Sequence, residues 1–211
     1  AVPRDFGNPY RMVDPGIAIK KHPSQYGTHR GIDAALELRQ THGIDPAKIR
    51  SVHIETPVMQ YVDRPSPSTG LDGKFSFQYT VASALWDGQV TMDTFTERML
   101  LRPGPQALLA KTSLTMNPDI SADFDEMWIT VTVRTEGGAE HSVKCDRLRG
   151  IWGSPLTREE RLTKVRQCAA RVLREAEADE LIDTVEDLDQ AAYRDVLELM
   201  GLLARSPSAS T

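Results

Sequence analysis

The sequence has few cysteines and no long apolar run. Two cysteines, Cys145 and Cys168, occur among 211 residues, too few and too far apart in the sequence for a disulfide framework or a cysteine-based zinc site. We expect both to be free thiols of a cytoplasmic protein, because reducing compartments keep thiols free. No apolar stretch approaches the roughly 20 residues that a membrane-spanning helix needs, and we expect no membrane partner.

An excess of positive charge is also absent. The formal net charge is −5, whereas nucleic-acid-binding domains are usually basic, so the sequence predicts no nucleic-acid partner. The segment 20–30 departs from this balance, because it has no acidic residue and carries five basic or imidazole side chains: Lys20, Lys21, His22, His29 and Arg30. A local basic cluster on an acidic protein fits a small anionic ligand.

Several motifs of known chemistry are missing as well. The sequence has no glycine-rich phosphate loop and no GxSxG element. His42, His53 and His141 lack the spacing of metal ligands, both among themselves and with the cysteines. We therefore predict no metal site.

The pattern of apolar residues predicts an α+β fold with a small, antiparallel-rich sheet and helices, followed by an all-helical segment. We expect strands at 49–57 and 112–116 and a hairpin at 128–145, since apolar and polar residues alternate there and glycines supply the hairpin turn. Helices are predicted at 29–42 and 75–86. The domain prediction is an α+β domain at 1–153, a helical segment at 154–205 and a disordered tail at 206–211.

The helical segment begins with a recognisable signal. Thr157 and Glu160 have the spacing of a capping box, and further helices are predicted at 178–186 and 188–204. Upstream, residues 1–15 contain several prolines and glycines and are expected to be irregular. A short strand is expected at 16–19, ending at Lys20. Thr28 is a suitable N-cap for the helix that starts at His29, and Gly43 is a suitable stop.

Four residues of this region are candidates for chemistry on their own properties. Lys20 at a strand end can bind a carboxylate or transfer a proton, and a plain solvated lysine is the alternative. His29 in the first helical turn can hold an anion or act as acid or base, or it can be satisfied by a local hydrogen bond. Tyr61 can donate to a developing oxyanion, and Arg64 can clamp a carboxylate. These residues are compatible with a lyase, an isomerase or a binding module.

The order of motifs resembles the MmgE/PrpD family. The similarity is carried by the segments Ile19–Pro23, Thr28–Ala34, Gln60–Pro65, Gly73–Gly88 and Gly153–Thr157. It extends over nearly the whole chain. It implies the C-terminal half of a two-domain subunit, in which a lid-type α+β domain is followed by helices that pack on an N-terminal helical domain of the same protein, and it implies a homodimer.

The resemblance also implies an activity. Family members are cofactor-independent enzymes, so we expect no cofactor and a dehydratase or decarboxylase acting on a small di- or tricarboxylate such as 2-methylcitrate or cis-aconitate. Lys20 and Tyr61 match catalytic positions, and His29, Gln25 and Arg64 are assigned to substrate binding. Gln25 stands where the decarboxylase branch has a histidine, and a glutamine cannot titrate near neutral pH. An epimerase of an amino-dicarboxylate and a non-catalytic anion-binding fragment remain the alternatives.

Overall fold

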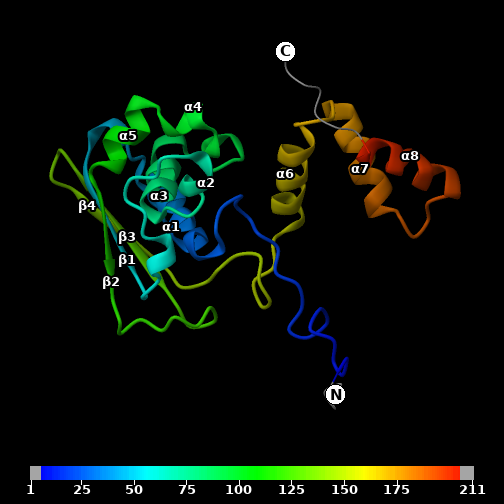
Figure 1. Ribbon diagram of the computed structural model, residues 1–211, viewed down its shortest axis with the longest axis horizontal. Coiled ribbons are helices and arrows are strands. Elements are labelled where there is room, and N and C mark those ends of the chain that lie inside the picture. Colours follow the sequence, from blue (N-terminus) through cyan, green and yellow to red (C-terminus); the bar gives the residue numbers. More distant parts are fainter. Residues whose placement is uncertain (1–5, 205–211) are drawn as a thin grey trace. The chain divides into compact units, whose positions relative to one another are not determined.

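The computed structural model describes residues 6–204 and contains two compact units, of which the first ends at Pro155 and the second begins at Leu156 (Figure 1). Each unit is described by itself. The tail predicted to be disordered, 206–211, lies outside the described residues.

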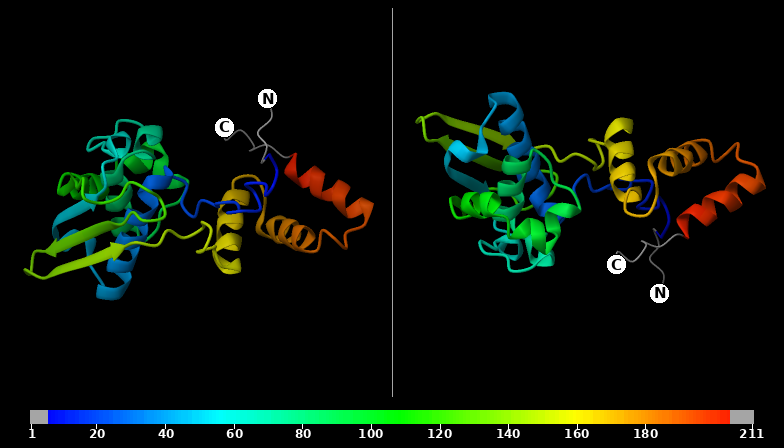
Figure 2. Two further views of the ribbon diagram at one scale, coloured as in Figure 1. Left: turned by 90° about the horizontal axis from the view of Figure 1, so that it is seen from below. Right: turned by 90° about the horizontal axis from the view of Figure 1, so that it is seen from above.

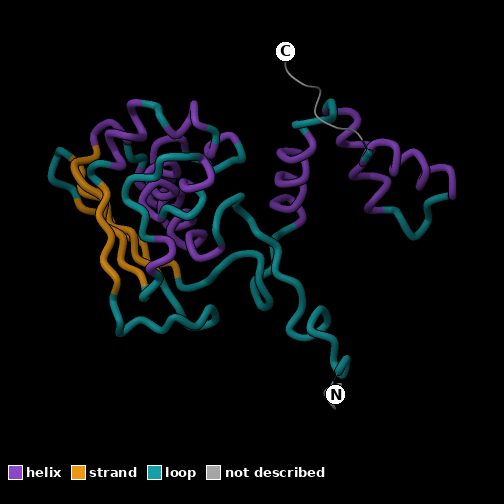
Figure 3. Tube along the Cα trace, in the orientation of Figure 1, coloured by secondary structure: helices purple, strands orange, loops and turns teal. Residues whose placement is uncertain are grey.

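The first unit is built on a mixed sheet of four strands in the order β2-β1-β3-β4 (Figure 3). The strands are β1 (Ile49–Thr56), β2 (Thr112–Met116), β3 (Ile129–Thr135) and β4 (Glu140–Cys145). β1 pairs with β2 in parallel, while β1 with β3 and β3 with β4 are antiparallel. The α+β prediction and its four strands are confirmed, and the one parallel pair makes the sheet mixed.

Apolar and polar residues alternate along the strands, so one face of the sheet is buried and the other is more exposed. Val131 and Val133 of β3 are fully buried and lie opposite Ile54 and Val52 of β1, as expected for side chains that point alternately to the two faces. The β3–β4 turn ends at Gly138, whose φ of 84° is a conformation that glycine adopts without strain.

The helices of the first unit gather on one face of this sheet (Figures 1 and 2). They are α1 (His29–His42), α2 (Gly70–Gly73), α3 (Phe77–Asp87), α4 (Glu97–Leu100) and α5 (Pro103–Leu109). α1 packs on α3, β3 and β4. α3, predicted at 75–86, is buried on every side from Phe77 to Leu85, because its sequence is apolar nearly all round.

Two local predictions near the basic cluster are wrong. Residues 16–19 form no strand. Ile19 donates a hydrogen bond to the Gly150 carbonyl at 2.7 Å, but a single bond does not make a ladder. Thr28 does not cap α1 with its side chain; its hydroxyl instead donates to the Gln25 carbonyl at 2.8 Å, because the chain enters α1 through a 3-10 turn, η1 (Tyr26–Thr28). Gly43 does end α1 in the left-handed conformation, with φ 58°.

The second unit consists of α6 (Arg158–Ala169), α7 (Glu175–Glu186) and α8 (Tyr193–Leu203). The predicted capping box is present: the Glu160 amide donates to the Thr157 hydroxyl at 3.1 Å, and the Thr157 amide donates to the Glu160 carboxylate at 2.8 Å. A small apolar cluster around Ala169, Ala178 and Leu202 holds the helices together. Across residues 6–204, no helix has both the length and the apolar character needed to cross a membrane.

Candidate functional site

The basic segment 20–30 forms a tight turn, here called the cationic turn, that leads into α1. The Gln25 amide N–H donates to the Lys74 carbonyl at 2.9 Å. The Gly27 amide N–H donates to the Gln25 side-chain oxygen at 2.5 Å, and the hydroxyls of Ser24 and Thr28 are hydrogen-bonded at 2.9 Å. Because its backbone and side chains are bonded to one another, the turn presents its remaining groups in fixed positions.

Lys20 folds back over this turn. Its ammonium group donates to the Ser24 carbonyl at 3.0 Å, and the residue as a whole is exposed. A lysine ammonium carries three N–H donors and no acceptor, which is the chemistry that suits an anionic ligand.

Gly27 brings Gln25 and Tyr61 together. A Cβ atom placed on Gly27 would lie 2.9 Å from the Gln25 side-chain oxygen and 3.1 Å from the Tyr61 hydroxyl. Both polar groups therefore lie directly over the Gly27 backbone. Tyr61 belongs to the short 3-10 turn η3 (Gln60–Val62) and is 48% exposed. Gln25 and Tyr61 thus meet over one buried glycine and together offer an amide and a phenol, while the Lys20 ammonium lies over the Ser24 carbonyl of the same turn.

His29 occupies the interior of the turn instead. It has no exposed surface, and its ring meets those of His22 and Tyr26 edge-on at centroid distances of 5.3 and 5.0 Å. Within residues 6–204, neither ring nitrogen has a hydrogen-bond partner. Burial, reinforced by the positive charge of His22, lowers the pKa of His29 to about 3. The imidazole is therefore neutral at physiological pH and can form hydrogen bonds but not ion pairs.

Asp33 is a member of this cluster that the sequence analysis did not single out. One of its carboxylate oxygens pairs with His22 Nε2 at 2.9 Å and with Lys21 Nζ at 3.0 Å. Burial by itself would raise the pKa of Asp33, but the hydrogen bond and charge of His22, helped by Lys21, hold that pKa below its usual value. The spacing offered a signal, because Asp33 lies four residues after His29 on one face of α1.

Arg64 is engaged by residues of its own loop. Its guanidinium forms an ion pair with Asp72, lies over the Phe75 ring at 5.1 Å and donates weakly to the Tyr61 carbonyl at 3.4 Å. The charge of Arg64 is thus already matched within its own loop. In the part of the chain that the structure describes, no group of three or more histidine, cysteine or acidic side chains is arranged to hold a metal ion.

Comparison with known proteins places this geometry in a family. A family model for the MmgE/PrpD C-terminal domain matches residues 22–190. Cis-aconitate decarboxylase of Mus musculus is 30% identical over 180 residues, and that of Homo sapiens is 30% identical over 178 residues. Each match covers 82% of this chain but 37% of the relative, so the chain spans little more than a third of the relatives' length. The resemblance predicted from the motifs is confirmed, and the chain belongs to the MmgE/PrpD C-terminal domain family.

Proposed function

We propose that this chain is the C-terminal part of a cofactor-independent lyase that acts on a small di- or tricarboxylate. The observation that carries the proposal is the meeting of Gln25 and Tyr61 over Gly27, in the same turn whose Ser24 carbonyl accepts from the Lys20 ammonium. The two relatives support it, because both are named cis-aconitate decarboxylase. Dehydration of a 2-methylcitrate-like acid and decarboxylation of a cis-aconitate-like acid are the two reactions we consider.

Each of the three groups has a role that suits its chemistry. Lys20 binds a substrate carboxylate through its ammonium group. Gln25 orients that carboxylate with its amide and does not titrate. Loss of CO2 and abstraction of a proton both leave negative charge on a carbon beside a carboxylate, and the carboxylate oxygens share that charge. Tyr61 donates a hydrogen bond to the oxygen that gains it.

The other two residues assigned to substrate binding take lesser roles. His29 contributes as a neutral hydrogen-bonding group beneath the turn, since burial takes its pKa to about 3. Arg64 can reach a substrate carboxylate only if it leaves Asp72, with which it is paired. The proton-transferring base is assigned to the N-terminal helical domain of the same protein, and we propose a homodimer as its assembly.

A product assay on the full-length protein tests this function. We expect 13C-labelled cis-aconitate or 2-methylcitrate to lose CO2 or water on incubation with the protein, and 13C NMR follows the labelled product. Tyr61→Phe removes the donor at the developing charge and should lower kcat by about 100-fold, the typical effect of losing one such donor. Tyr193→Phe is the matched control, because Tyr193 is exposed in the second unit. Full activity of Tyr61→Phe contradicts the assigned role.

An epimerase acting on an amino-dicarboxylate is the second candidate. Gln25 weighs against decarboxylation of cis-aconitate itself, because its side-chain oxygen is bonded to the Gly27 amide and its amide group offers no titratable proton; the acid and base of an epimerase would come from other residues. Loss of optical rotation without release of CO2 or water identifies this reaction. Binding of these acids without turnover by the full-length protein identifies the non-catalytic alternative.

A further inference from the structure

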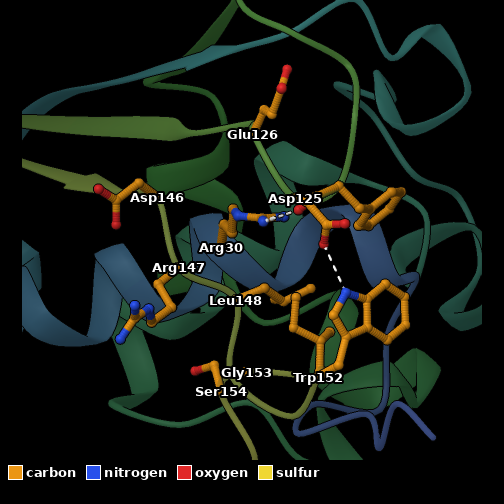
Figure 4. A pocket seen from close by; sticks show the side chains of 11 residues that line it. Arg30, Asp125, Glu126, Asp146, Arg147, Leu148, Trp152, Gly153 and Ser154 are labelled. Carbon is orange, nitrogen blue, oxygen red and sulfur yellow. Dashed lines mark hydrogen bonds between the residues drawn. The ribbon is translucent and has the colours of Figure 1, made fainter. Parts of the chain in front are cut away.

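A second polar cavity lies in the first unit, beside the first turn of α1. Its volume is about 450 Å³, within the range of small-molecule sites. Its walls come from α1, from the loop before β3 and from the segment after β4: Arg30, Phe124, Asp125, Glu126, Asp146, Arg147, Leu148, Ile151, Trp152, Gly153 and Ser154. Figure 4 shows the Arg30 guanidinium among these side chains, with Asp146 and Arg147 on one side and Asp125 and Trp152 on the other.

Arg30 is a buried charge that forms no ion pair with a carboxylate among the described residues. It is 2% exposed. One terminal nitrogen donates to the Phe124 carbonyl at 2.5 Å, and the guanidinium lies 6.0 Å from the centre of the Phe124 ring. Its Nε has no hydrogen-bond partner among the described residues, and Asp125 and Asp146 act on it only from a distance. A buried guanidinium without a directly paired anion is costly, so this arrangement favours a ligand that brings an anionic oxygen to the guanidinium.

The rest of the wall restricts what that ligand can be. The lining contains two arginines, Arg30 and Arg147, and three carboxylates, Asp125, Glu126 and Asp146. A polyanion would be repelled by the carboxylates, whereas a molecule with one carboxylate and one ammonium group matches both signs. Phe124, Leu148, Ile151 and Trp152 add apolar surface for a hydrocarbon side chain.

We propose that this cavity binds an α-amino acid as a zwitterion, with its carboxylate on the Arg30 guanidinium and its ammonium group facing the lining carboxylates. The site is separate from the groups around Gly27, since neither Lys20, Gln25 nor Tyr61 lines the cavity. The inference does not depend on the proposed lyase function.

Titration of the 15N-labelled 211-residue chain with L-leucine tests the proposal by NMR. The chemical shift of the Arg30 Nε–H group should change as L-leucine is added, because the carboxylate binds the guanidinium. The indole N–H signal of Trp152, which donates to Asp125 at 3.0 Å, should shift with the same saturation curve. L-leucinamide lacks the carboxylate and 4-methylpentanoate lacks the ammonium group, and each should bind at least about tenfold more weakly because one charge-assisted contact is lost.

Two variants complete the test. Arg30→Lys keeps the charge but loses the planar fork, and it should weaken L-leucine binding by about tenfold. Arg134→Lys is the control: Arg134 is an exposed arginine of β3 that pairs with Glu140 and does not line this cavity, so binding should stay within about twofold of the original. The ligand comparison needs no folded variant. Equal binding of L-leucinamide and L-leucine, an unmoved Arg30 signal, or displacement of L-leucine by citrate at that signal would each overturn the proposal.

Discussion

Replacing Gly27 by alanine perturbs the candidate site while adding a single methyl group. The new Cβ would lie 2.9 Å from the Gln25 side-chain oxygen and 3.1 Å from the Tyr61 hydroxyl, and carbon–oxygen pairs do not approach so closely without one of them moving. The Gln25 oxygen is the end of a flexible side chain, so it is the atom that gives way. Its hydrogen bond to the Gly27 amide, at 2.5 Å, is then lost.

The expected change in stability is small because two effects oppose each other. Loss of one hydrogen bond costs about 0.5–1.5 kcal/mol. Alanine restricts the unfolded chain and returns about 0.4–1 kcal/mol, and Gly27 does not have the positive φ that would penalise a side chain. The free energy of unfolding should therefore change by less than about 1 kcal/mol, which corresponds to a few degrees in Tm for a chain of this size.

The expected change in activity is much larger. Gln25 is displaced from the position that we assign to substrate recognition and Tyr61 is crowded, and a misplacement of about 1 Å can cost about 100-fold in rate. We expect kcat/KM of the full-length Gly27→Ala protein to fall by about that factor, measured in the product assay alongside urea unfolding. Gly201→Ala is the matched control, since a Cβ there meets open space. A Gly27→Ala protein with unchanged kcat/KM refutes the idea that these groups act over Gly27.

Two further predictions concern titration and thiol chemistry. The pKa of His29 is about 3 in the folded chain against an ordinary value of 6.5, so between these pH values the unfolded chain binds more protons than the folded chain. The free energy of unfolding should therefore keep the full His29 contribution above pH 6.5 and fall by several kcal/mol towards pH 3. Urea unfolding at pH 7.5, 6, 5 and 4 should show this slope, His29→Phe should flatten it, and an equal slope in both contradicts the assignment. Burial raises the pKa of Cys145 to about 12 while Cys168 is exposed, so maleimide labelling followed by mass spectrometry should modify Cys168 first; faster labelling of Cys145 opposes this account.

Regular alternation and capping made much of the fold predictable. The strand at β1, the β3–β4 hairpin and the capping box of Thr157 and Glu160 follow from local patterns that the structure retains. The parallel pairing of β2 with β1 was not predicted, because strand order depends on contacts between segments about 60 residues apart. Residues 16–19 have the composition of a strand, but no neighbouring strand pairs with them there.

The arrangement of the candidate residues could not be predicted from the sequence. The chemistry of Lys20 and Tyr61 and their place in a family motif make them candidates, yet nothing in the sequence indicates that Gly27 brings Tyr61 to Gln25. The pairing of His22 with Asp33 was missed for a similar reason, since the turn that folds His22 back onto α1 is set by hydrogen bonds to distant backbone such as Lys74. The neutral state of His29 follows from burial, which composition does not reveal.

The central claim is that Lys20 binds a substrate carboxylate, and its most direct test is kcat/KM of Lys20→Met in the full-length protein. Lys48→Met serves as the control, because Lys48 is a highly exposed lysine whose nearest acid is Asp45 at 3.8 Å. We predict a loss of at least about 100-fold for Lys20→Met, since a charge-assisted contact to the substrate disappears, and a change within about twofold for Lys48→Met. A Lys20→Met protein that turns over substrate as fast as the Lys48→Met protein contradicts the claim.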